Sequence, residues 1–270
     1  MIIPAQHDIA FNLFGISVYW YGIIMALGMF FALLYANKLF NDKHKDLKKD
    51  IILEFAPVII ICGILCARLY FCLLNHQYYL SHPVEIFDIR EGGLSIHGGI
   101  IGGILSMLFI VKKYRLNFFT VIDPVACSTF LGQAIGRWGN YFNSEAYGFP
   151  VAGQTWGLYI PQSKRLSGYA QFDLFHPAFL YESILDLVSF IILVFIYKKF
   201  GEKFKGLVFF SYLIFYAIIR FFIEQIRIDS ALNVGSIPIA QIVSVILLII
   251  GISGIIYVLK PILAKSFSGK

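Results

Sequence analysis

Seven long apolar runs, separated by polar segments, make up most of the chain. Each run is close to the length of about 20 residues that a helix needs to cross the hydrocarbon core of a bilayer. The predicted spans cover residues 18–37, 51–74, 96–111, 119–136, 179–197, 206–224 and 238–259. This pattern predicts an all-α polytopic membrane protein with seven transmembrane helices.

The composition agrees with a membrane protein. Of the 270 residues, 59% are apolar and 14% are charged, whereas apolar residues make up about half of an ordinary soluble domain. The formal net charge is +6, but the cations gather in clusters between the apolar runs, as in proteins that set their orientation in a membrane. We therefore expect no nucleic-acid partner.

The basic clusters predict the orientation in the membrane. They occupy alternate connecting segments and the C-terminal end, and comprise Lys38, Lys43, Lys45, Lys48 and Lys49; Lys112, Lys113 and Arg115; Lys198, Lys199, Lys203 and Lys205; and Lys260, Lys265 and Lys270. Because short loops rich in Lys and Arg stay in the cytoplasm, the N-terminus is predicted outside and the C-terminus cytoplasmic. The first 14 residues contain no Lys or Arg, so the first span is expected to be an uncleaved anchor.

Two longer connections, residues 75–95 and 137–178, lie on the predicted outer side. Gly, Pro, Ser and Gln collect in the second connection, so we expect a small extracytoplasmic subdomain there, with a short strand near Thr155–Tyr159. The expected organisation is a single membrane-embedded domain, residues 1–270, in which residues 137–178 form an extracytoplasmic insertion between spans four and five.

Three arginines, Arg68, Arg137 and Arg220, lie within predicted spans or at their outer ends. A charge at the bilayer centre costs about 2.5 to 3.5 kcal/mol on insertion scales, so such a residue normally faces a bundle interior, a wet cavity or a carboxylate. Each arginine alone could extend to the outer headgroups or pair with an acid. Together, three guanidinium groups at similar depth favour a bound anion, and the abundant outward-facing phosphates of a membrane belong to phospholipids.

Two further polar residues allow both a structural and a functional interpretation. Glu224 lies four residues after Arg220, so the two can form an ion pair along one helix or serve a ligand together. His97 begins the third span and can be a structural residue or a proton acceptor near neutral pH. Gly99 and Gly103, in the same span, are spaced as in closely packed membrane helices.

The densest group of polar residues is the segment 132–148, which reads GQAIGRWGNYFNSEAYG. A helix end with a turn, in which Gly139 or Gly148 supplies positive φ, would explain part of it. Such a turn does not need the matched Arg137, Asn140 and Glu145. At a water boundary these groups favour a ligand site, in which the arginine and the amide donate to oxyanions and Glu145 orients a donor or accepts a proton.

The four cysteines, Cys62, Cys66, Cys72 and Cys127, all lie in apolar runs without His or Asp at metal-ligand spacing. We interpret them as small buried apolar residues. The chain also lacks a glycine-rich nucleotide loop after a strand and a Gly-x-Ser-x-Gly elbow. Neither a metal nor another cofactor is expected.

The stretch Gly136–Glu145 closely resembles the signature of the bacterial prolipoprotein diacylglyceryl transferases. Other blocks resemble that family in the same order along the chain: Trp20–Gly22, His97–Gly99, His176–Glu182, and Arg220 with Glu224. The chain departs from the family at Tyr141, where Phe is common, and at Ala178 and Phe179, where many members carry a hydroxyl and an amide. A polar role for the last two positions is therefore not expected.

The resemblance implies a catalytic domain in a bacterial plasma membrane that moves diacylglycerol from phosphatidylglycerol onto the lipobox cysteine of a prolipoprotein signal peptide. The thiol must lose its proton, and the departing phosphate must have its charge held. By analogy with the family, Arg137 and Arg220 hold the phosphate. His97 and Tyr21 are both candidates for proton handling and headgroup contact, and the identity of the base stays open.

The same analogy extends to four further residues that would line a phosphatidylglycerol site. Asn140 would donate to an oxyanion or to a glycerol hydroxyl. Glu145 and Glu224 would orient these groups, and Gly148 would let the backbone approach. The expected partners are therefore phosphatidylglycerol, the prolipoprotein and the surrounding membrane lipids.

Two other classes of protein fit the sequence less well. A transporter or channel for an anionic solute could line its path with arginines, but the cytoplasmic halves of the spans are nearly all apolar and no inverted repeat is visible. A scaffold built from glycine-rich helices would not need the polar segment 132–148.

Overall fold

The computed structural model describes residues 2–4, 8–88, 92–228, 233–234 and 237–268. Among these residues, seven helices are long and apolar enough to cross a membrane, which confirms the seven predicted spans. They are α1 (Trp20–Lys43), α2 (Ile51–Leu74), α4 (Ile96–Tyr114), α5 (Phe118–Asn143), α6 (Ala178–Phe200), α7 (Leu207–Ile226) and α8 (Ile239–Ser268). Lys270, from the last basic cluster, lies outside the described residues. The orientation in the membrane stays a prediction.

The fourth span is longer than predicted. The pattern places its end at residue 136, because polar residues follow, but α5 continues to Asn143. Gly139 is therefore an interior residue of the helix, and the interpretation that it supplies positive φ at a helix end is wrong. The positive φ values of the turn belong to Ser144 and Ala146, at 56° and 55°. These polar residues can be part of the helix because other residues of the fold supply hydrogen-bond and ion-pair partners for them.

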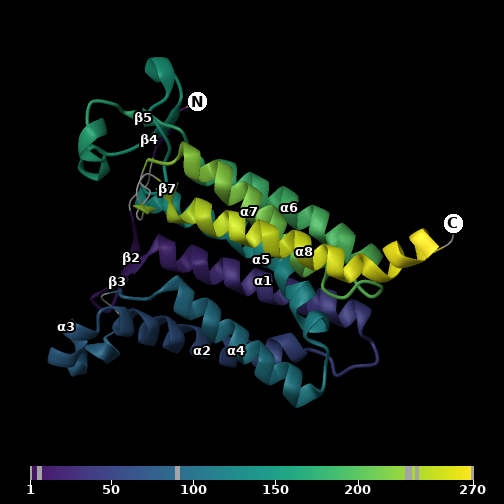
Figure 1. The fold of residues 1–270 in the computed structure, drawn as a ribbon. Helices are drawn as coiled ribbons and strands as arrows, with labels where there is room; N and C mark the ends of the chain where they lie inside the picture. Colours follow the sequence, from purple (N-terminus) through teal and green to yellow (C-terminus); the bar gives the residue numbers. More distant parts are fainter. Residues whose placement is uncertain (1, 5–7, 89–91, 229–232, 235–236, 269–270) are drawn as a thin grey trace. The chain divides into compact units, whose positions relative to one another are not determined.

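The chain forms two compact units. Residues 37–122 make up one, called here the small unit, and residues 1–36 with 123–270 make up the other, the large unit. In the small unit, α2 packs along α4, and α3 (His76–Ser81) and the 3₁₀ helix η1 (Pro83–Phe87) follow α2 (Figure 1). The large unit contains α6, α7 and α8, with α7 packed along both α6 and α8.

Two glycines allow the close contact of α2 with α4, but not the two that the sequence suggests. A Cβ on Gly98 would overlap the carbonyl oxygen of Cys66, and a Cβ on Gly102 would overlap that of Cys62. A Cβ on Gly103 would meet nothing within 4 Å. Glycines of α4 therefore form a helix contact, as expected. The glycines that face α2 are Gly98 and Gly102, each one residue before the predicted Gly99 and Gly103.

Arg68 has a structural role in the small unit. Its guanidinium donates to four backbone carbonyls, those of Glu85, Ile86, Gly92 and Gly93, at 2.5 to 3.1 Å. Arg68 is 7% exposed. Since its donors are used by the chain itself, the prediction that Arg68 joins the other two arginines in binding an anion is wrong. It fastens η1 and the backbone of Gly92 and Gly93, shortly before α4, to α2.

A short connection between α1 and α2 is held by side-chain hydrogen bonds. The amides of Asn37 and Asn41 donate to Oδ1 of Asp50 at 2.7 and 2.9 Å. These two donors, Asn37 first, hold the pKa of the Asp50 carboxyl below its usual range. Asp50 precedes α2 in the left-handed conformation, with φ of 60°, so the hydrogen bonds compensate for a strained backbone.

The carboxylate of Asp123 on α5 caps the beginning of α7 in the large unit. Its two oxygens accept from the backbone N–H groups of Gly206 and Phe209, at 2.8 and 2.9 Å. Asp123 is 1% exposed. The first N–H groups of a helix have no partners within the helix, so this buried carboxylate satisfies donors that would otherwise be left unpaired.

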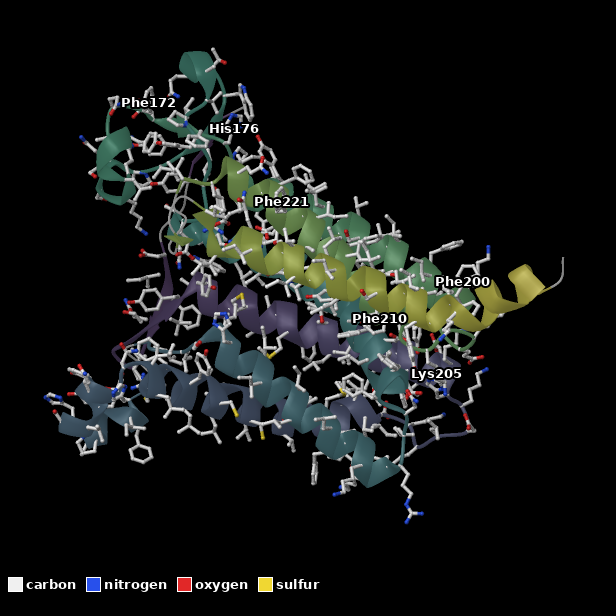
Figure 2. All side chains as sticks on the ribbon, viewed as in Figure 1. Phe172, His176, Phe200, Lys205, Phe210 and Phe221 are labelled. Carbon is white, nitrogen blue, oxygen red and sulfur yellow. The ribbon has the colours of Figure 1, made fainter. Side chains whose placement is uncertain are left out.

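Residues 144–177 form a small subdomain at the beginning of α6, and Figure 2 labels two of its residues, Phe172 and His176. Its sheet pairs β1 (Ile2–Pro4) in parallel with β4 (Gly157–Tyr159), and β4 in antiparallel with β5 (Leu174–Phe175). The short strand expected near Thr155–Tyr159 is confirmed as β4. The other elements are the 3₁₀ helices η2 (Ala152–Gln154), η3 (Gln162–Lys164) and η4 (Ser167–Tyr169).

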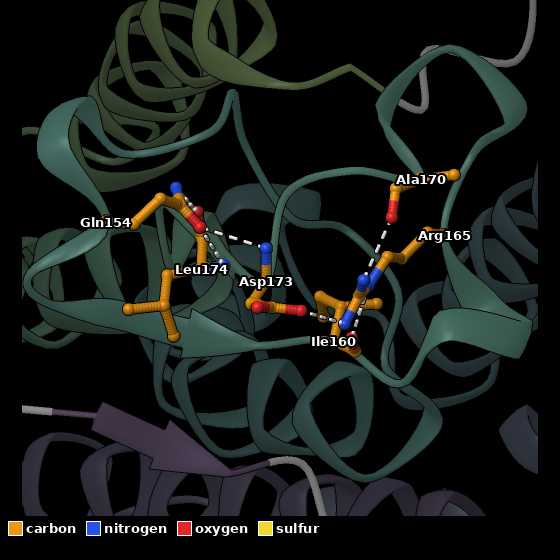
Figure 3. A network of polar contacts seen from close by, with 6 residues as sticks. All are labelled: Gln154, Ile160, Arg165, Ala170, Asp173 and Leu174. Carbon is orange, nitrogen blue, oxygen red and sulfur yellow. Dashed lines mark hydrogen bonds and ion pairs between the residues drawn. The ribbon is translucent and has the colours of Figure 1, made fainter.

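Buried aromatic and aliphatic residues join the subdomain to α5 and α6: Tyr141, Tyr147, Leu158, Ile160, Phe175 and Phe179. Side chains also supplement the short strands (Figure 3). Oε1 of Gln154 accepts from the N–H groups of Asp173 and Leu174, at 2.9 and 2.8 Å. Arg165 donates to the carboxylate of Asp173 at 2.6 Å. These bonds replace the backbone ladder that strands of two or three residues cannot supply.

The remaining strands form two hairpins in the large unit. Strand β2 (Ile9–Leu13) pairs in antiparallel with β3 (Ile16–Tyr19), directly before α1. Strand β6 (Asn233–Val234) pairs in antiparallel with β7 (Ile237–Pro238), directly before α8. Phe200 and Lys205, labelled in Figure 2, mark the end of α6 that is opposite to the subdomain.

Candidate active site

Arg137 lies in the last two turns of α5, and its guanidinium contacts α6. Nη2 of Arg137 is 2.7 Å from Oε1 of Glu182. The side chain of Glu182 is 3% exposed and that of Arg137 is 22% exposed. The buried carboxylate therefore fixes one edge of the guanidinium, and the N–H groups on its accessible part can bind an oxyanion in a planar, bidentate manner.

Arg220 and Glu224 form the ion pair along α7 that their spacing predicts. Nη2 of Arg220 is 2.6 Å from Oε2 of Glu224, with side chains 17% and 4% exposed. Nη1 of Arg220 is buried and has no hydrogen-bond partner among the described residues. The pair thus orients a second guanidinium and leaves a donor of Arg220 for another group.

Tyr21 packs against the backbone of α5. A Cβ at Gly139 would lie 2.8 Å from Cδ2 of Tyr21, so the tyrosine ring needs a glycine at this position. Tyr21 interacts electrostatically with both Glu145 and Arg137. The start of α1 therefore brings a phenol to the arginine and the carboxylate near the end of α5.

Glu145 is oriented by two amides. Nδ2 of Asn140 donates to Oε1 of Glu145 at 2.9 Å, and Nδ2 of Asn143 donates to the same oxygen at 3.3 Å. The N–H of Glu145 also donates to the carbonyl of Asn140, at 3.0 Å. The turn after α5 thus folds the carboxylate back onto the last turn of the helix.

Gly148 is buried where three segments of the large unit meet. Its N–H donates to the carbonyl of His176 at 2.8 Å, and a Cβ at this position would lie 2.8 Å from Cγ2 of Ile226 and 2.9 Å from Cβ of His176. Gly148 is not among the glycines with positive φ, so the interpretation that it supplies positive φ is wrong. A glycine is needed here because Ile226 at the end of α7 and His176, directly after β5, both contact this position.

A buried polar network near Arg137 is not predicted from the sequence. Gln133 is hydrogen-bonded to Tyr212, and Asp186 interacts electrostatically with Arg137, Glu182 and Tyr212. Asp186 and Glu182 are each 2% exposed. Glu182 lies in a block quoted for the family resemblance, and Asp186 follows it by one helical turn in an apolar run. That spacing is the signal that could have found Asp186, because two acids on one face of an apolar span need partners.

Tyr216 connects the two arginines. It interacts electrostatically with Arg220 and Arg137, and also with Glu182 and Asp186. Seven of the eight predicted site residues therefore lie in the large unit, and Tyr216 on α7 interacts with both arginines.

His97 is the eighth predicted site residue and belongs to the small unit. It is the second residue of α4, it is exposed, and its ring lies 6.0 Å from that of Tyr70. The N–H of Ser95, two residues earlier, donates to the carbonyl of Ala67 at 3.0 Å. The beginning of α4 is thus fixed on α2, and the imidazole is available for proton transfer.

The arrangement suits the displacement of a phosphate. Two arginines, each paired with a buried glutamate, can hold the charge of a phosphoester, and a tyrosine and a fixed carboxylate lie beside one of them. Most of the surrounding helix surface is apolar, and the exposed apolar side chains of the spans suit a lipid environment.

Comparison with known proteins agrees with this chemistry. The sequence model of the family described as prolipoprotein diacylglyceryl transferase matches residues 8–257. A protein of Clostridium novyi (strain NT) with the name phosphatidylglycerol–prolipoprotein diacylglyceryl transferase is 42% identical over 247 residues, which cover 92% of this chain and 94% of the relative.

Two further relatives carry the same name. The protein of Clostridioides difficile (strain 630) is 42% identical over 252 residues, 93% of this chain and 95% of the relative. The protein of Staphylococcus aureus (strain MSSA476) is 43% identical over 254 residues, 92% of this chain and 88% of the relative. With seven membrane-spanning helices and a match over nearly its whole length, the chain belongs to the prolipoprotein diacylglyceryl transferase family.

Proposed function

We propose that this protein transfers the diacylglyceryl group of phosphatidylglycerol to the lipobox cysteine of a prolipoprotein signal peptide, the first step in the maturation of a lipoprotein. The observation that carries this proposal is the pair of arginines on α5 and α7, each held by a buried glutamate within a bundle of apolar helices. Family membership supplies the identity of the two substrates.

The proposed reaction forms one bond to carbon and breaks one. The thiolate sulfur attacks the glyceryl carbon that bears the phosphoester, a C–S bond forms, and the C–O bond to phosphate breaks. The thiol proton goes to a base, and glycerol phosphate leaves with the electron pair of the broken bond. In this proposal Arg137 and Arg220 hold the negative charge that develops on the phosphate, because preorganised donors in a dry site stabilise such charge strongly.

The roles of the neighbouring groups follow from their contacts. Asn140 donates to Glu145 and can share its second N–H with an oxyanion or a glycerol hydroxyl. Glu145 and Glu224 orient these donors, and Gly148 keeps the backbone at the end of α7 in close contact with the turn. For the base, His97 and Tyr21 both remain candidates. We expect neither a metal nor another cofactor.

The proposed location is the plasma membrane of a bacterium, with the active site toward the extracytoplasmic leaflet. The basic clusters support a cytoplasmic C-terminus and an extracytoplasmic N-terminus, by the positive-inside rule. Arg137, Tyr21 and the subdomain of residues 144–177 belong to the ends of spans that this orientation places outside. We expect no nucleic-acid partner.

One experiment tests this function against an anion transporter and a scaffold. Purified protein is incubated with phosphatidylglycerol labelled in its acyl chains and with a lipobox peptide, and a peptide with the cysteine replaced by serine is the control. We expect label on the cysteine peptide only, together with release of glycerol phosphate. No thiol-dependent transfer across a range of phosphatidylglycerol species would disprove the proposal.

A further inference from the structure

Several buried polar atoms in the large unit lack a hydrogen-bond partner among the described residues, and three of these atoms belong to side chains near Arg137. They are Oδ2 of Asp186, Oε1 of Gln133 and Nη1 of Arg220. Asp186 is 2% exposed, so its carboxylate has no access to bulk solvent. Buried polar atoms are nearly always hydrogen-bonded, and leaving one unpaired is costly. Each of the three atoms can therefore bind a partner from outside the described residues.

The three atoms belong to one network. Tyr212 is hydrogen-bonded to Gln133 and interacts electrostatically with Asp186. Tyr216 interacts with Asp186 and with Arg220. Helices α5, α6 and α7 each contribute one of the atoms, so the network lies within the bundle that carries both arginines.

The hydrogen-bonding capacity of these atoms is specific. Asp186 and Gln133 offer two acceptors, and Arg220 offers a donor. A ligand that suits them has two hydroxyl donors and an anionic acceptor. The glycerol headgroup of phosphatidylglycerol carries two hydroxyls next to a phosphodiester, which is this combination.

A cationic headgroup suits the same network less well. An ammonium group could pair with Asp186, but Arg137 interacts with that carboxylate and would repel a second cation. A neutral hydroxyl can donate to Asp186 without this repulsion. The charges around Asp186 therefore favour a polyol headgroup over an amine.

We propose that Asp186, assisted by Gln133, forms the subsite that receives the hydroxyls of the phosphatidylglycerol headgroup and so determines which phospholipid is used. This inference rests on the proposed function. Asp186 contacts the leaving part of the lipid, whereas Arg137 and Arg220 contact its phosphate. The pair Asp186 and Gln133 is thus a specificity element, distinct from the groups that perform the displacement.

The test compares two lipid substrates that share a phosphodiester. Phosphatidylethanol lacks both headgroup hydroxyls, and the measured quantity is the ratio of kcat/KM for phosphatidylglycerol to kcat/KM for phosphatidylethanol. Hydrogen bonds to a charged group are the strong ones, so we expect wild-type protein to prefer phosphatidylglycerol by roughly 10- to 100-fold. In Asp186→Asn, which keeps the size of the side chain, the ratio should fall by about 10-fold, mainly through loss of activity on phosphatidylglycerol.

Two further variants complete the test. Gln133→Met should lower the ratio of the two kcat/KM values by a smaller factor. If Asp186→Asn does not fold, the ratio measured for Gln133→Met tests the subsite in its place. Ser189→Ala changes another buried polar residue of α6 and should leave the ratio at the wild-type value. Phosphatidylethanolamine, as a third substrate, should remain poor with wild-type protein.

The results of this test distinguish a failure of the headgroup subsite from a failure of the proposed transferase function. Without thiol-dependent transfer by the wild-type protein from either lipid, the transferase function itself fails. If transfer from phosphatidylglycerol occurs but a folded Asp186→Asn variant loses activity on both lipids equally, the network holds water only and the headgroup subsite is disproved. The same conclusion follows if wild-type protein does not distinguish the two lipids.

Discussion

Nη2 of Arg137 on α5 lies 2.7 Å from Oε1 of Glu182 on α6, and the carboxylate is almost completely buried. An arginine that must bind a phosphate gains from this arrangement, because its orientation is set before the ligand arrives. The glutamate occupies one edge of the planar guanidinium and leaves the accessible part for the ligand. In the proposed reaction Arg137 thus has two partners: Glu182, which stays bound, and the phosphate, which leaves with the product.

Replacing Arg137 with lysine should lower kcat/KM for phosphatidylglycerol by roughly 10- to 100-fold. A lysine is a point charge and cannot hold Glu182 and a phosphate at the same time with a planar set of donors. The measurement is the transfer of labelled lipid to the lipobox peptide. Arg115→Lys, a change at an exposed position of the small unit, is the matched control and should retain full activity. Full activity of Arg137→Lys would show that charge alone is sufficient.

Glu182→Gln should impair the protein in a different manner. The amide keeps the size of the side chain but leaves the guanidinium of Arg137 without its anionic partner, so we expect the free energy of unfolding to fall by about 1–3 kcal/mol. The KM for phosphatidylglycerol should rise because Arg137 is less well oriented. Thermal unfolding in detergent and lipid titration measure the two effects. An unchanged KM would contradict the positioning role of Glu182.

The identity of the base can be read from the pH dependence of two variants. Loss of a general base lowers the rate by about 10² to 10⁴-fold. A thiol with a free pKa near 8.5 ionises without help at high pH, so the variant that lacks the base should recover activity as the pH rises. We expect this recovery for His97→Gln. Near-normal transfer by His97→Gln, with loss of transfer by Tyr21→Phe, would exclude the histidine as base.

Gly139→Ala should reduce transfer strongly although alanine is the better helix former. Its Cβ would lie 2.8 Å from Cδ2 of Tyr21 and displace the ring from the group formed with Arg137 and Glu145. Gly103→Ala is the matched control, because a Cβ there meets nothing within 4 Å. That change should leave transfer unaffected and stabilise α4 by up to about 1 kcal/mol. Equal transfer by the two variants would contradict the close contact of Tyr21 with α5.

Arg68→Met should loosen the segment before α4 without removing a ligand group. The carbonyls of Glu85, Ile86, Gly92 and Gly93 lose their donor, so we expect a loss of about 1–3 kcal/mol in stability and faster amide hydrogen exchange in residues 84–88 and 92–95. Hydrogen exchange followed by mass spectrometry measures the effect. Exchange that is unchanged in this segment, together with a selective loss of phosphate binding, would restore Arg68 to the group of anion-binding arginines.

The spans could be predicted from the sequence because apolar runs of the right length have few alternatives in a membrane. The position of Arg68 in its span could be predicted as well, but its partners could not, since backbone carbonyls carry no signal in the sequence. The end of α5 was misplaced for a related reason. The polar residues after Gly136 predict a loop, because their partners, Glu182 and the subdomain, are distant in the sequence.

The candidate site was predictable to the extent that its residues are close in the sequence. Asn140 and Glu145 are five residues apart and form a hydrogen bond, and Arg220 and Glu224 are one turn apart and form an ion pair. Asp186, Tyr212 and Gln133 come from three helices, and each looks unremarkable in its own span. Only the packing of these helices shows that their polar atoms meet.

The cap that Asp123 provides for α7 has a consequence for the two arginines. Arg137 lies fourteen positions after Asp123 on α5, and Arg220 on α7 lies fourteen positions after Gly206. At 1.5 Å per residue both stretches are roughly 20 Å long. The hydrogen bonds of Asp123 hold the two helices together at one end, so they also set the position of one guanidinium relative to the other along the bundle. A small sliding of α7, begun at the far end of the bundle, would therefore shift one guanidinium against the other.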